Sequence, residues 1–326
     1  MDGFLDLNNQ IIQSCLKYLL SDKTTKGNII FATDSYSDLG PFFQAECEIT
    51  KELLPQLDLK PRILKSHEEQ VQRTRKKAEV FTPAWLTCKM NNHCDDEWFG
   101  RKDVFNHLEG ETWTVTEGSI SFPDEKKKRW NKYVDSRRIE ITCGEAPYIV
   151  SRYDAATGET IPIKDRVGIL DRKLRVVNEN TKNREEWFKW ALRAFQSVYG
   201  YEWQGDSLLI ARINLLMTYI EYYTQRWEYD PTDKELTKMI LNVANVIAWN
   251  FWQMDGLQGT VPYKKRTPVA GEAVQSNIFD MGWDLGIENE DELKKKFLST
   301  IGEECLIFDW RGNKSMTYNS LKRNQN

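Results

Sequence analysis

The chain has 326 residues, of which 40% are hydrophobic and 29% charged, and its formal net charge is −4. This composition is typical of a folded protein with a large core and excludes an intrinsically disordered chain. The negative charge argues against a basic coat wrapped around nucleic acid, while leaving room for a local basic groove. No apolar run reaches the length of a membrane span, so we expect no membrane association.

The cysteines and the first residues indicate a cytoplasmic protein. Six cysteines are scattered along the chain and do not form the dense framework of a secreted disulfide protein. Asp2 stands where a secretion signal carries basic residues. Cys88, His93 and Cys94 lie close together, but their spacing matches no usual zinc pattern. We therefore predict no metal site.

Residues 1–77 are predicted to form an N-terminal, mainly helical extension. The apolar spacing favours an amphipathic helix at 5–20, a strand at 28–33 and a short helix at 48–54. No spacing in this region indicates chemistry. The basic run at 73–77 is interpreted either as a solvated face or as a contact to a phosphate backbone.

A helix is predicted to begin at Thr82-Pro83, because Thr suits an N-cap and Pro suits a first helical turn. It should extend to about residue 92. Residues 95–135 are rich in tryptophan and charged side chains, which favours an insertion with short strands at 112–115 and 120–122. The charged run at 124–129 is expected to face solvent.

The strand that follows is the centre of the predicted fold. Residues 138–142 are mainly β-branched and contain Glu140, and the small residues of Cys143-Gly144-Glu145-Ala146 form a turn. Such a turn brings backbone N–H groups close to a ligand, and a carboxylate at a strand end can hold ligand hydroxyls or an ammonium group. The pair Tyr148-Ile149 is expected to start a helix.

A second strand and helix follow a helical pattern at 183–198. The segment Tyr199-Gly200-Tyr201-Glu202 ends the predicted strand, and the helix after it carries Ala211-Arg212-Ile213-Asn214-Leu215. Glu202 would stand beside the end of the first strand, where a carboxylate can accept both ribose hydroxyls of an adenosine. Arg212 and Asn214 are expected to be packing and capping partners of that helix.

A third unit begins with a helix predicted at 233–245. Residues 246–251 are predicted to form the third strand, and Asp255-Gly256-Leu257 follows it. A carboxylate at that strand end accepts an N–H group and rejects a carbonyl. We therefore expect the ends of the first three strands to carry Glu140, Glu202 and Asp255 at one edge of a mostly parallel sheet.

In this order, the segments resemble the motifs of N6-adenine DNA methyltransferases of restriction–modification systems. Glu79-Val80-Phe81-Thr82-Pro83 resembles the motif before the cofactor strand, residues 140–148 resemble the first motif, and the segments at Glu202 and Asp255 resemble the second and third. The resemblance covers residues 78–257. It implies an α/β fold, with a Rossmann-like S-adenosylmethionine-dependent methyltransferase sheet and helices on both faces in residues 78–260. Residues 261–326 are expected to form a C-terminal loop, helix and β-hairpin.

The resemblance also implies a cofactor site. In this family the Thr-Pro turn lies over the methionine end of S-adenosylmethionine, the acid of the second motif binds the ribose and the acid of the third binds the adenine amine. Ala146 stands where the family usually has a second glycine, a change that would narrow the turn. The expected cofactor-binding residues are Phe81, Thr82, Pro83, Glu140, Cys143, Gly144, Ala146, Glu202, Trp203, Asp255 and Leu257.

The catalytic motif of the family is missing. These enzymes need an Asn-Pro-Pro-aromatic or Asp-Pro-Pro-aromatic tetrapeptide that binds the target amine and stacks on the flipped base. The nearest string, Thr260-Val261-Pro262-Tyr263, lacks the amide and the first proline. We therefore predict no catalytic residue in this chain and no methyl transfer by the chain alone.

Two functions remain open from the sequence. The first is the S-adenosylmethionine-binding part of a DNA adenine-N6 methyltransferase, with a second subunit supplying the tetrapeptide and target recognition. The alternative is a catalytically inactive methyltransferase-like protein that binds DNA, nucleotide or a restriction–modification or anti-restriction partner. Loss of S-adenosylmethionine binding would favour the alternative.

Overall fold

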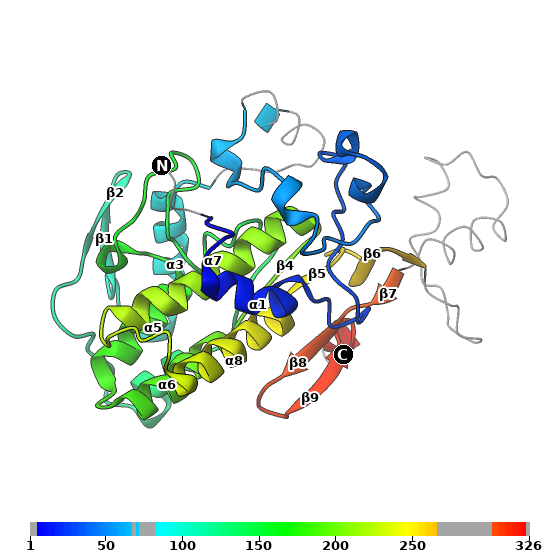
Figure 1. The fold of residues 1–326 in the computed structure, drawn as a ribbon. Helices are drawn as coiled ribbons and strands as arrows, with labels where there is room; N and C mark the ends of the chain where they lie inside the picture. Colours follow the sequence, from blue (N-terminus) through cyan, green and yellow to red (C-terminus); the bar gives the residue numbers. More distant parts are fainter. Residues whose placement is uncertain (1–4, 67–69, 72–81, 266–301, 324–326) are drawn as a thin grey trace, which may run out of the picture.

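The computed structural model describes residues 5–66, 70–71, 82–265 and 302–323, and these residues form a mixed α/β fold (Figure 1). The described helices of four or more residues are α1 (Gln10–Leu20), α3 (Ala84–Phe99), α4 (Trp130–Val134), α5 (Ile169–Asn180), α6 (Arg184–Gln196), α7 (Gly205–Thr224), α8 (Lys234–Asn250) and α11 (Ser320–Arg323). The strands are β1 (Asn106–Glu109), β2 (Thr112–Val115), β3 (Arg138–Glu140), β4 (Val198–Glu202), β5 (Phe251–Gln253), β6 (Thr260–Lys265), β7 (Gly302–Glu304), β8 (Leu306–Asp309) and β9 (Lys314–Thr317).

The sheet that carries the predicted motifs has three parallel strands in the order β3-β4-β5. Glu140 is in register with Gly200, and Glu202 is in register with Gln253. The carboxyl ends of the three strands therefore lie at the same end of the sheet, as the sequence predicts for Glu140 and Glu202. The other described sheets are two-stranded and antiparallel, and they include the predicted C-terminal hairpin of β8 and β9.

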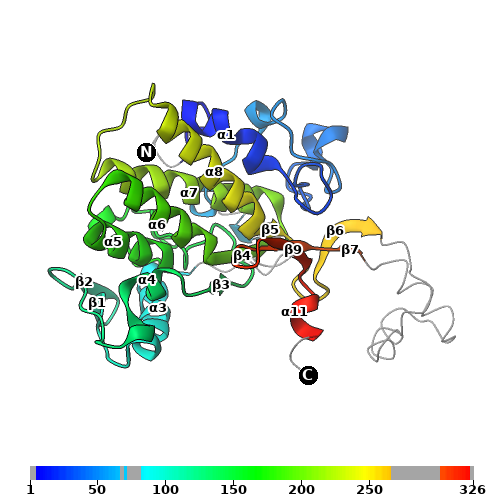
Figure 2. The ribbon, with the colours of Figure 1, turned by 90° about the horizontal axis from the view of Figure 1, so that it is seen from below.

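The two faces of the parallel sheet are covered differently. Helices α6, α7 and α8 pack together and contact β4 on one face, where Figure 2 shows them side by side. On the other face, Tyr201 and Trp252 are buried in a separate apolar cluster with Cys305 and Ile307. In the described residues, strands of the C-terminal region and not a helix cover this part of the second face. Within the described residues, the expected helices cover only one face of β4 and β5.

The two edges of the sheet also differ. Beyond β5, the side-chain amide of Gln253 accepts a hydrogen bond from the Ile30 N–H and donates one to the Ile30 carbonyl, each at 2.9 Å. At the opposite edge, Arg138 N–H donates to the Ser197 carbonyl, so in a parallel ladder the backbone groups of Ile139 point away from β4. Ile139 and Ile141 are 49% and 64% exposed. Among the described strands, β3 thus forms an open edge.

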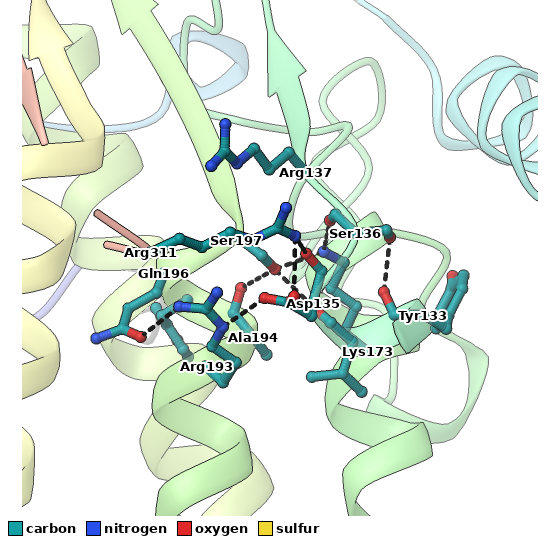
Figure 3. Close-up of polar contacts among 12 residues, drawn as sticks. Tyr133, Asp135, Ser136, Arg137, Lys173, Arg193, Ala194, Gln196, Ser197 and Arg311 are labelled. Atoms are coloured by element: carbon teal, nitrogen blue, oxygen red, sulfur yellow. Dashed lines mark hydrogen bonds and ion pairs between the residues drawn. The ribbon is translucent and has the colours of Figure 1, made fainter. Parts of the chain in front are cut away.

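The amino-terminal end of the sheet is held together by a buried lysine. Lys173 on α5 has no exposed surface and donates to the Ser136 carbonyl and, at 2.6 Å, to Ser197 Oγ. Ser197 Oγ in turn contacts the Val134 carbonyl. These residues lie just before β3 and β4, so one side chain connects the entries of two neighbouring strands (Figure 3). Burial lowers the pKa of the Lys173 ammonium well below its ordinary value.

Several predicted elements differ from the structure in their bounds or do not form, among them the strand at 120–122 and the helix at 48–54. Residues 246–250 continue α8 and only Phe251–Gln253 form the third strand, because Asn250 is fixed by hydrogen bonds from its side chain to the carbonyls of Phe195 and Val198. No helix starts at Tyr148-Ile149, where the chain forms turns, and the next helix is α5. Residues 28–33 form isolated bridges instead of the predicted strand. The helix expected near residues 291–298 lies outside the described residues.

None of the described helices combines the length and the apolar character that crossing a bilayer requires.

Candidate functional site

The first two predicted carboxylates meet at the carboxyl ends of β3 and β4. The backbone N–H of Gly144, in the turn after β3, donates a 2.9 Å hydrogen bond to Oε2 of Glu202. The carboxylate that ends one strand thus holds the loop that leaves the neighbouring strand. This arrangement confirms that Glu140, Gly144 and Glu202 lie at the same end of one sheet, as the spacing of the sequence predicts.

The turn after β3 has an unusual backbone conformation. Thr142, Gly144 and Ala146 have φ angles of +48°, +52° and +64°, in the left-handed region that non-glycine residues adopt only at a cost. Ala146 is fully buried, so its Cβ fills space inside the turn where a glycine would leave room. A Cβ placed on Gly144 would meet no atom within 4 Å. The turn is therefore narrow at Ala146 and open at Gly144.

The Cys143 side chain is buried between the turn and β4, so it is not placed to contact a ligand. It is 1% exposed, and its backbone N–H donates to the Tyr201 carbonyl at 2.8 Å. A Cβ on Gly200 would lie 3.1 Å from the Cys143 Sγ atom and 2.7 Å from the Phe251 ring. The glycine of the Tyr-Gly-x-Glu segment is thus explained by close packing of the turn, β4 and β5.

Glu202 is fixed by three backbone donors. Besides Gly144, the N–H groups of Trp203 and Gln204 donate to its Oε1 atom at 2.8 and 3.1 Å. A carboxylate offers about four lone-pair positions, so these contacts orient the group and also compete with any ligand hydroxyls. Glu202 is 8% exposed, so its carboxylate is buried.

Glu140 contains a buried acceptor atom without a hydrogen bond in the described residues. Its Oε1 accepts from Tyr148 N–H at 3.3 Å, whereas Oε2 has no partner and the residue is only 7% exposed. Burial raises the pKa of this carboxyl well above its ordinary value, and the nearby Glu202 carboxylate raises it further. A cationic or hydrogen-bond-donating ligand group would satisfy this atom and favour its ionised form.

The Thr82-Pro83 turn lies against the loop after β3. The Thr82 side chain lies near the Tyr148 hydroxyl and opposes the rise of its pKa on burial, and this hydroxyl contacts the Met90 sulfur at 3.2 Å. Pro83 is the N-cap of α3 and not a residue of its first turn, so the predicted start is displaced by one residue. The first amide of the helix, Ala84 N–H, donates to Asp154 Oδ2 at 2.7 Å. Phe81 lies outside the described residues.

The third strand contributes differently from the prediction. The residue in register with Glu202 is Gln253, whereas Asp255 lies two residues further along and its Oδ1 accepts from the N–H groups of Leu257 and Gln258. Leu257 is 91% exposed. Asp255 is therefore near the correct edge of the sheet but is bound to its own turn, and Leu257 points into solvent.

The N-terminal region also borders the site, which the sequence did not indicate. Gly205 N–H donates to the Phe31 carbonyl, and the Trp203 indole donates to the Ala32 carbonyl at 3.1 Å. A Cβ on Gly205 would lie 1.9 Å from the Ile30 carbonyl oxygen, so only glycine allows this approach. Spacing along the sequence gave no signal for these contacts, because the partners are more than one hundred positions apart.

A buried ion pair lies at the start of α7, beside the loop that follows Glu202. Lys65 Nζ is 3.1 Å from Asp206 Oδ2, and Tyr36 donates to the same oxygen at 3.0 Å. The side chain of Asp206 is fully buried. In the same area, Glu145 accepts from Arg62 N–H at 2.6 Å. Segments from three parts of the N-terminal region are thus fixed to the loops of the site.

Of the two residues of α7 that the sequence assigned to packing and capping, Arg212 has a packing role, whereas Asn214 donates to the Glu145 carbonyl in the turn after β3 and accepts from Arg152. The buried Arg212 guanidinium donates to the carbonyls of Leu19, Ser21 and Phe251, which ties α1 and β5 to α7. The cysteines near His93 are not brought together either, since Cys88 is buried and Cys94 is exposed on α3. Among the described residues, no group of three or more histidine, cysteine or acidic side chains is placed to hold a metal ion.

Comparison of the chain with protein-family models, with curated proteins and with solved structures found no match. Two buried carboxylates, an open glycine turn and a tyrosine surround one end of a parallel sheet, an arrangement suited to a polar ligand with hydroxyl and cationic groups.

Proposed function

We propose that the chain is the S-adenosylmethionine-binding part of a DNA adenine-N6 methyltransferase of a restriction–modification system. The observation that supports this most directly is the hydrogen bond between Gly144 N–H and Glu202, at the ends of adjacent parallel strands. A ligand crossing the ends of such strands meets a carboxylate and a backbone turn together, as in nucleotide sites of Rossmann-like sheets.

Each part of the cofactor has a candidate partner. Glu202 would accept the ribose hydroxyls, and the unpartnered Oε2 atom of Glu140 suits the ammonium group of the methionine part. Asp255 is proposed to accept the adenine amine, and Thr82, beside Tyr148, to contact the methionine end. The buried oxygen of Glu140 and the open side of Gly144 fit such a ligand. When bound, the cofactor would supply an electrophilic methyl group.

A second polypeptide would complete the enzyme. The sequence has no Asn-Pro-Pro-aromatic tetrapeptide, which holds the target amine in enzymes of this kind. The open edge of β3, with Ile139 and Ile141 exposed, offers backbone groups to which a strand of another chain can add. We propose that this second subunit binds there and contributes catalysis and DNA target recognition. Because the genome is the substrate, the proposed location is the cytoplasm.

The alternative function is also supported by specific contacts. Three backbone N–H groups already bind the Glu202 carboxylate, and Ala84 N–H at the start of α3 is bound by Asp154. In these contacts, backbone and side-chain groups of the protein itself occupy the hydrogen-bonding positions that a ligand would use. They favour a catalytically inactive methyltransferase-like protein that binds DNA, nucleotide or a restriction–modification partner.

Titration calorimetry with S-adenosylhomocysteine and S-adenosylmethionine separates the two functions. We expect binding of both ligands with micromolar to submillimolar affinity, and no binding of adenosine triphosphate at similar concentrations. Glu111→Ala, an exposed change at the end of the β1–β2 hairpin, serves as the matched control for acid substitutions. A flat titration of the wild-type chain at millimolar ligand would exclude the cofactor function and favour the alternative.

The need for a second chain has a separate test. The purified chain is expected to transfer no labelled methyl group to duplex DNA, because positioning of the target base requires the absent tetrapeptide. Methyl transfer by the chain alone would contradict this expectation, whatever the result of the calorimetry.

A further inference from the structure

A polar cavity lies beside α5, between this helix, the end of α7 and the β1–β2 hairpin (Figure 2). Its volume is about 440 Å³, which is within the range of sites that enclose a small molecule. The lining residues on α5 extend from Asp171 to Glu179, a length of about 12 Å along the helix. Glu140 and Glu202 are not among the lining residues, so the cavity is separate from the proposed cofactor site.

Two buried polar atoms of the lining residues have no hydrogen-bond partner in the described part of the chain. They are Oδ1 of Asp171 and Nε of Arg172, whose side chains are 0% and 1% exposed. The other Asp171 oxygen accepts from the Ser151 N–H at 2.8 Å, and Arg172 Nη1 donates to Asp95 at 2.6 Å. Since buried polar groups are normally hydrogen-bonded, the cavity wall retains one acceptor and one donor for a ligand.

The Asp171 acceptor is ionised at neutral pH. Burial raises its pKa to about 6, and the Arg166 guanidinium, with Nη1 3.9 Å from Oδ1, opposes this rise. That separation is too long for a hydrogen bond, so Arg166 does not occupy the acceptor position. Arg166 Nη1 instead pairs with Glu221 at 2.6 Å.

Cations outnumber acids on the cavity wall. The lining contains the acids Asp171 and Glu179 and the cations Lys164, Arg166, Arg172, Arg175 and Arg226. Glu179 pairs with Arg175 at 2.8 Å. Lys164 and Arg226 form no ion pair with any described residue, and Arg226 donates to carbonyl groups of the α5 end, among them that of Asn178 at 2.7 Å. The acids Glu117 and Asp165 are neighbours of lining residues in the sequence but do not line the cavity.

The aromatic side chains of the lining leave little ring surface for stacking. The Arg172 guanidinium lies over the Phe105 ring, 5.3 Å from its centre. Phe105 and Tyr222 are only 2% and 3% exposed. A nucleobase would therefore find no free ring face here, whereas an anionic group can accept from arginine and a hydroxyl can donate to Asp171.

We propose that this cavity binds a small hydroxylated anion without a nucleobase, of the chemical class of sugar phosphates and hydroxy acids. Its phosphate or carboxylate would accept hydrogen bonds from the cationic wall, for which arginine is especially suited. A hydroxyl of the same molecule would donate to Oδ1 of Asp171, the buried acceptor that the protein leaves unused. The proposal does not depend on the proposed cofactor function, because the two sets of residues are different.

Titration calorimetry of the full chain with ribose 5-phosphate and with citrate tests the proposal and distinguishes the two sources of the anion. We expect at least one of them to bind with a submillimolar dissociation constant, about tenfold or more below that of inorganic phosphate, because only the hydroxylated ligand satisfies Asp171. No binding of either organic anion at millimolar concentration would overturn the proposal. Equal affinity for inorganic phosphate, or tighter binding of adenosine triphosphate, would also overturn it.

A matched pair of tryptophan variants tests the location. Val115 lines the cavity, and Thr114 is exposed on the opposite face of β2. Val115→Trp fills the cavity and should abolish binding, whereas Thr114→Trp adds the same bulk outside it and should bind as the wild type does. Urea denaturation checks that both variants are folded. Equal effects of the two substitutions would contradict the assignment.

A charge variant provides a second test that leaves the core unchanged. Lys164 is exposed on the cavity wall, and Lys164→Glu should weaken binding about tenfold, while Lys164→Arg should retain it. Lys238→Glu makes the same charge change at an exposed position of α8 and should bind as the wild type does. Equal losses for Lys164→Glu and Lys238→Glu would show a general charge effect and overturn the proposal.

Discussion

Glu202 fixes the turn that follows the neighbouring strand, because the N–H of Gly144, 58 positions earlier in the chain, donates to its Oε2 atom. Its Oε1 atom binds the first two amides after β4. One carboxylate therefore shapes the loops after two strands. Any substitution of Glu202 is expected to affect both the ligand and the backbone around it.

Replacement of Glu202 by alanine is predicted to weaken binding of S-adenosylhomocysteine at least tenfold. Charge-assisted hydrogen bonds to ribose hydroxyls are worth about 1.5–3 kcal/mol each, and the change also releases the Gly144 turn. Asp255→Ala should cost less, since its Oδ1 is bound by its own turn, and Thr82→Ala should cost least. Calorimetric dissociation constants check this order, and a larger loss for Thr82→Ala than for Glu202→Ala would contradict it.

Ligand affinity is predicted to rise with pH from the ordinary carboxyl range up to the raised pKa of Glu140. Burial and the adjacent Glu202 raise the pKa of Glu140, so in that range the free protein binds more protons on this group than a complex in which a ligand ammonium favours the carboxylate. Below the raised pKa, each pH unit gained should therefore lower the dissociation constant by up to about tenfold. Glu140→Gln should remove this dependence of the dissociation constant on pH. Calorimetry in buffers of different ionisation enthalpy measures the protons released on binding, and this release should be absent in the variant. Parallel pH profiles for both proteins would assign the effect to another group.

Gly200→Ala is predicted to destabilise the protein by about 1–3 kcal/mol, the usual cost of overpacking a core. The new methyl group would lie 2.7 Å from the buried Phe251 ring and 3.1 Å from Cys143. Urea denaturation measures the change. A double-mutant cycle with Phe251→Leu should recover part of the loss, because the smaller side chain leaves room. Additive effects of the two substitutions would show that the contact is not the cause.

Lys173 is predicted to make stability rise with pH. Its pKa is lowered in the folded protein by burial, so above this lowered pKa and below the ordinary lysine value the unfolded chain binds more protons than the folded one. The free energy of unfolding then increases as pH rises through that window. Lys173→Met should remove this contribution, and urea denaturation at pH 7 and pH 9 compares the two proteins. The difference between wild type and variant should grow in favour of the wild type at the higher pH.

The sequence predicted the parts of the fold that depend on local pattern. The strand ends at Glu140 and Glu202 were predicted because each acid lies in a β-branched or aromatic segment that reaches a glycine, Gly144 or Gly205, within a few residues. The third strand was placed too early, since 246–249 are apolar residues that suit either a strand or a buried helix. The contacts of Asn250 with Phe195 and Val198 favour the helix, and these depend on tertiary packing.

The part of the site that was not predicted comes from long-range contacts. Tyr36 and Lys65 reach Asp206 across 170 and 141 positions, and no periodicity in 1–77 signals such partners. The pairing of Gln253 with Glu202 was missed for a related reason, because the acid at position 255 matched the family pattern and the amide did not. Local spacing identified the carboxylates. The N-terminal residues that surround them could be identified only from the three-dimensional structure.

The hydrogen bonds between Ile30 and Gln253 connect residues 223 positions apart, and this has a consequence for folding during synthesis. A ribosome adds residues in order, so the segment around Ile30 emerges long before the strand that it caps. Phe31 and Ala32 lack their contacts until the loop after β4 has been synthesised. Ile30 lacks its partner until Gln253 has left the exit tunnel. The segment that is made first therefore takes its final place among the last, and the nascent chain exposes apolar surface throughout that interval.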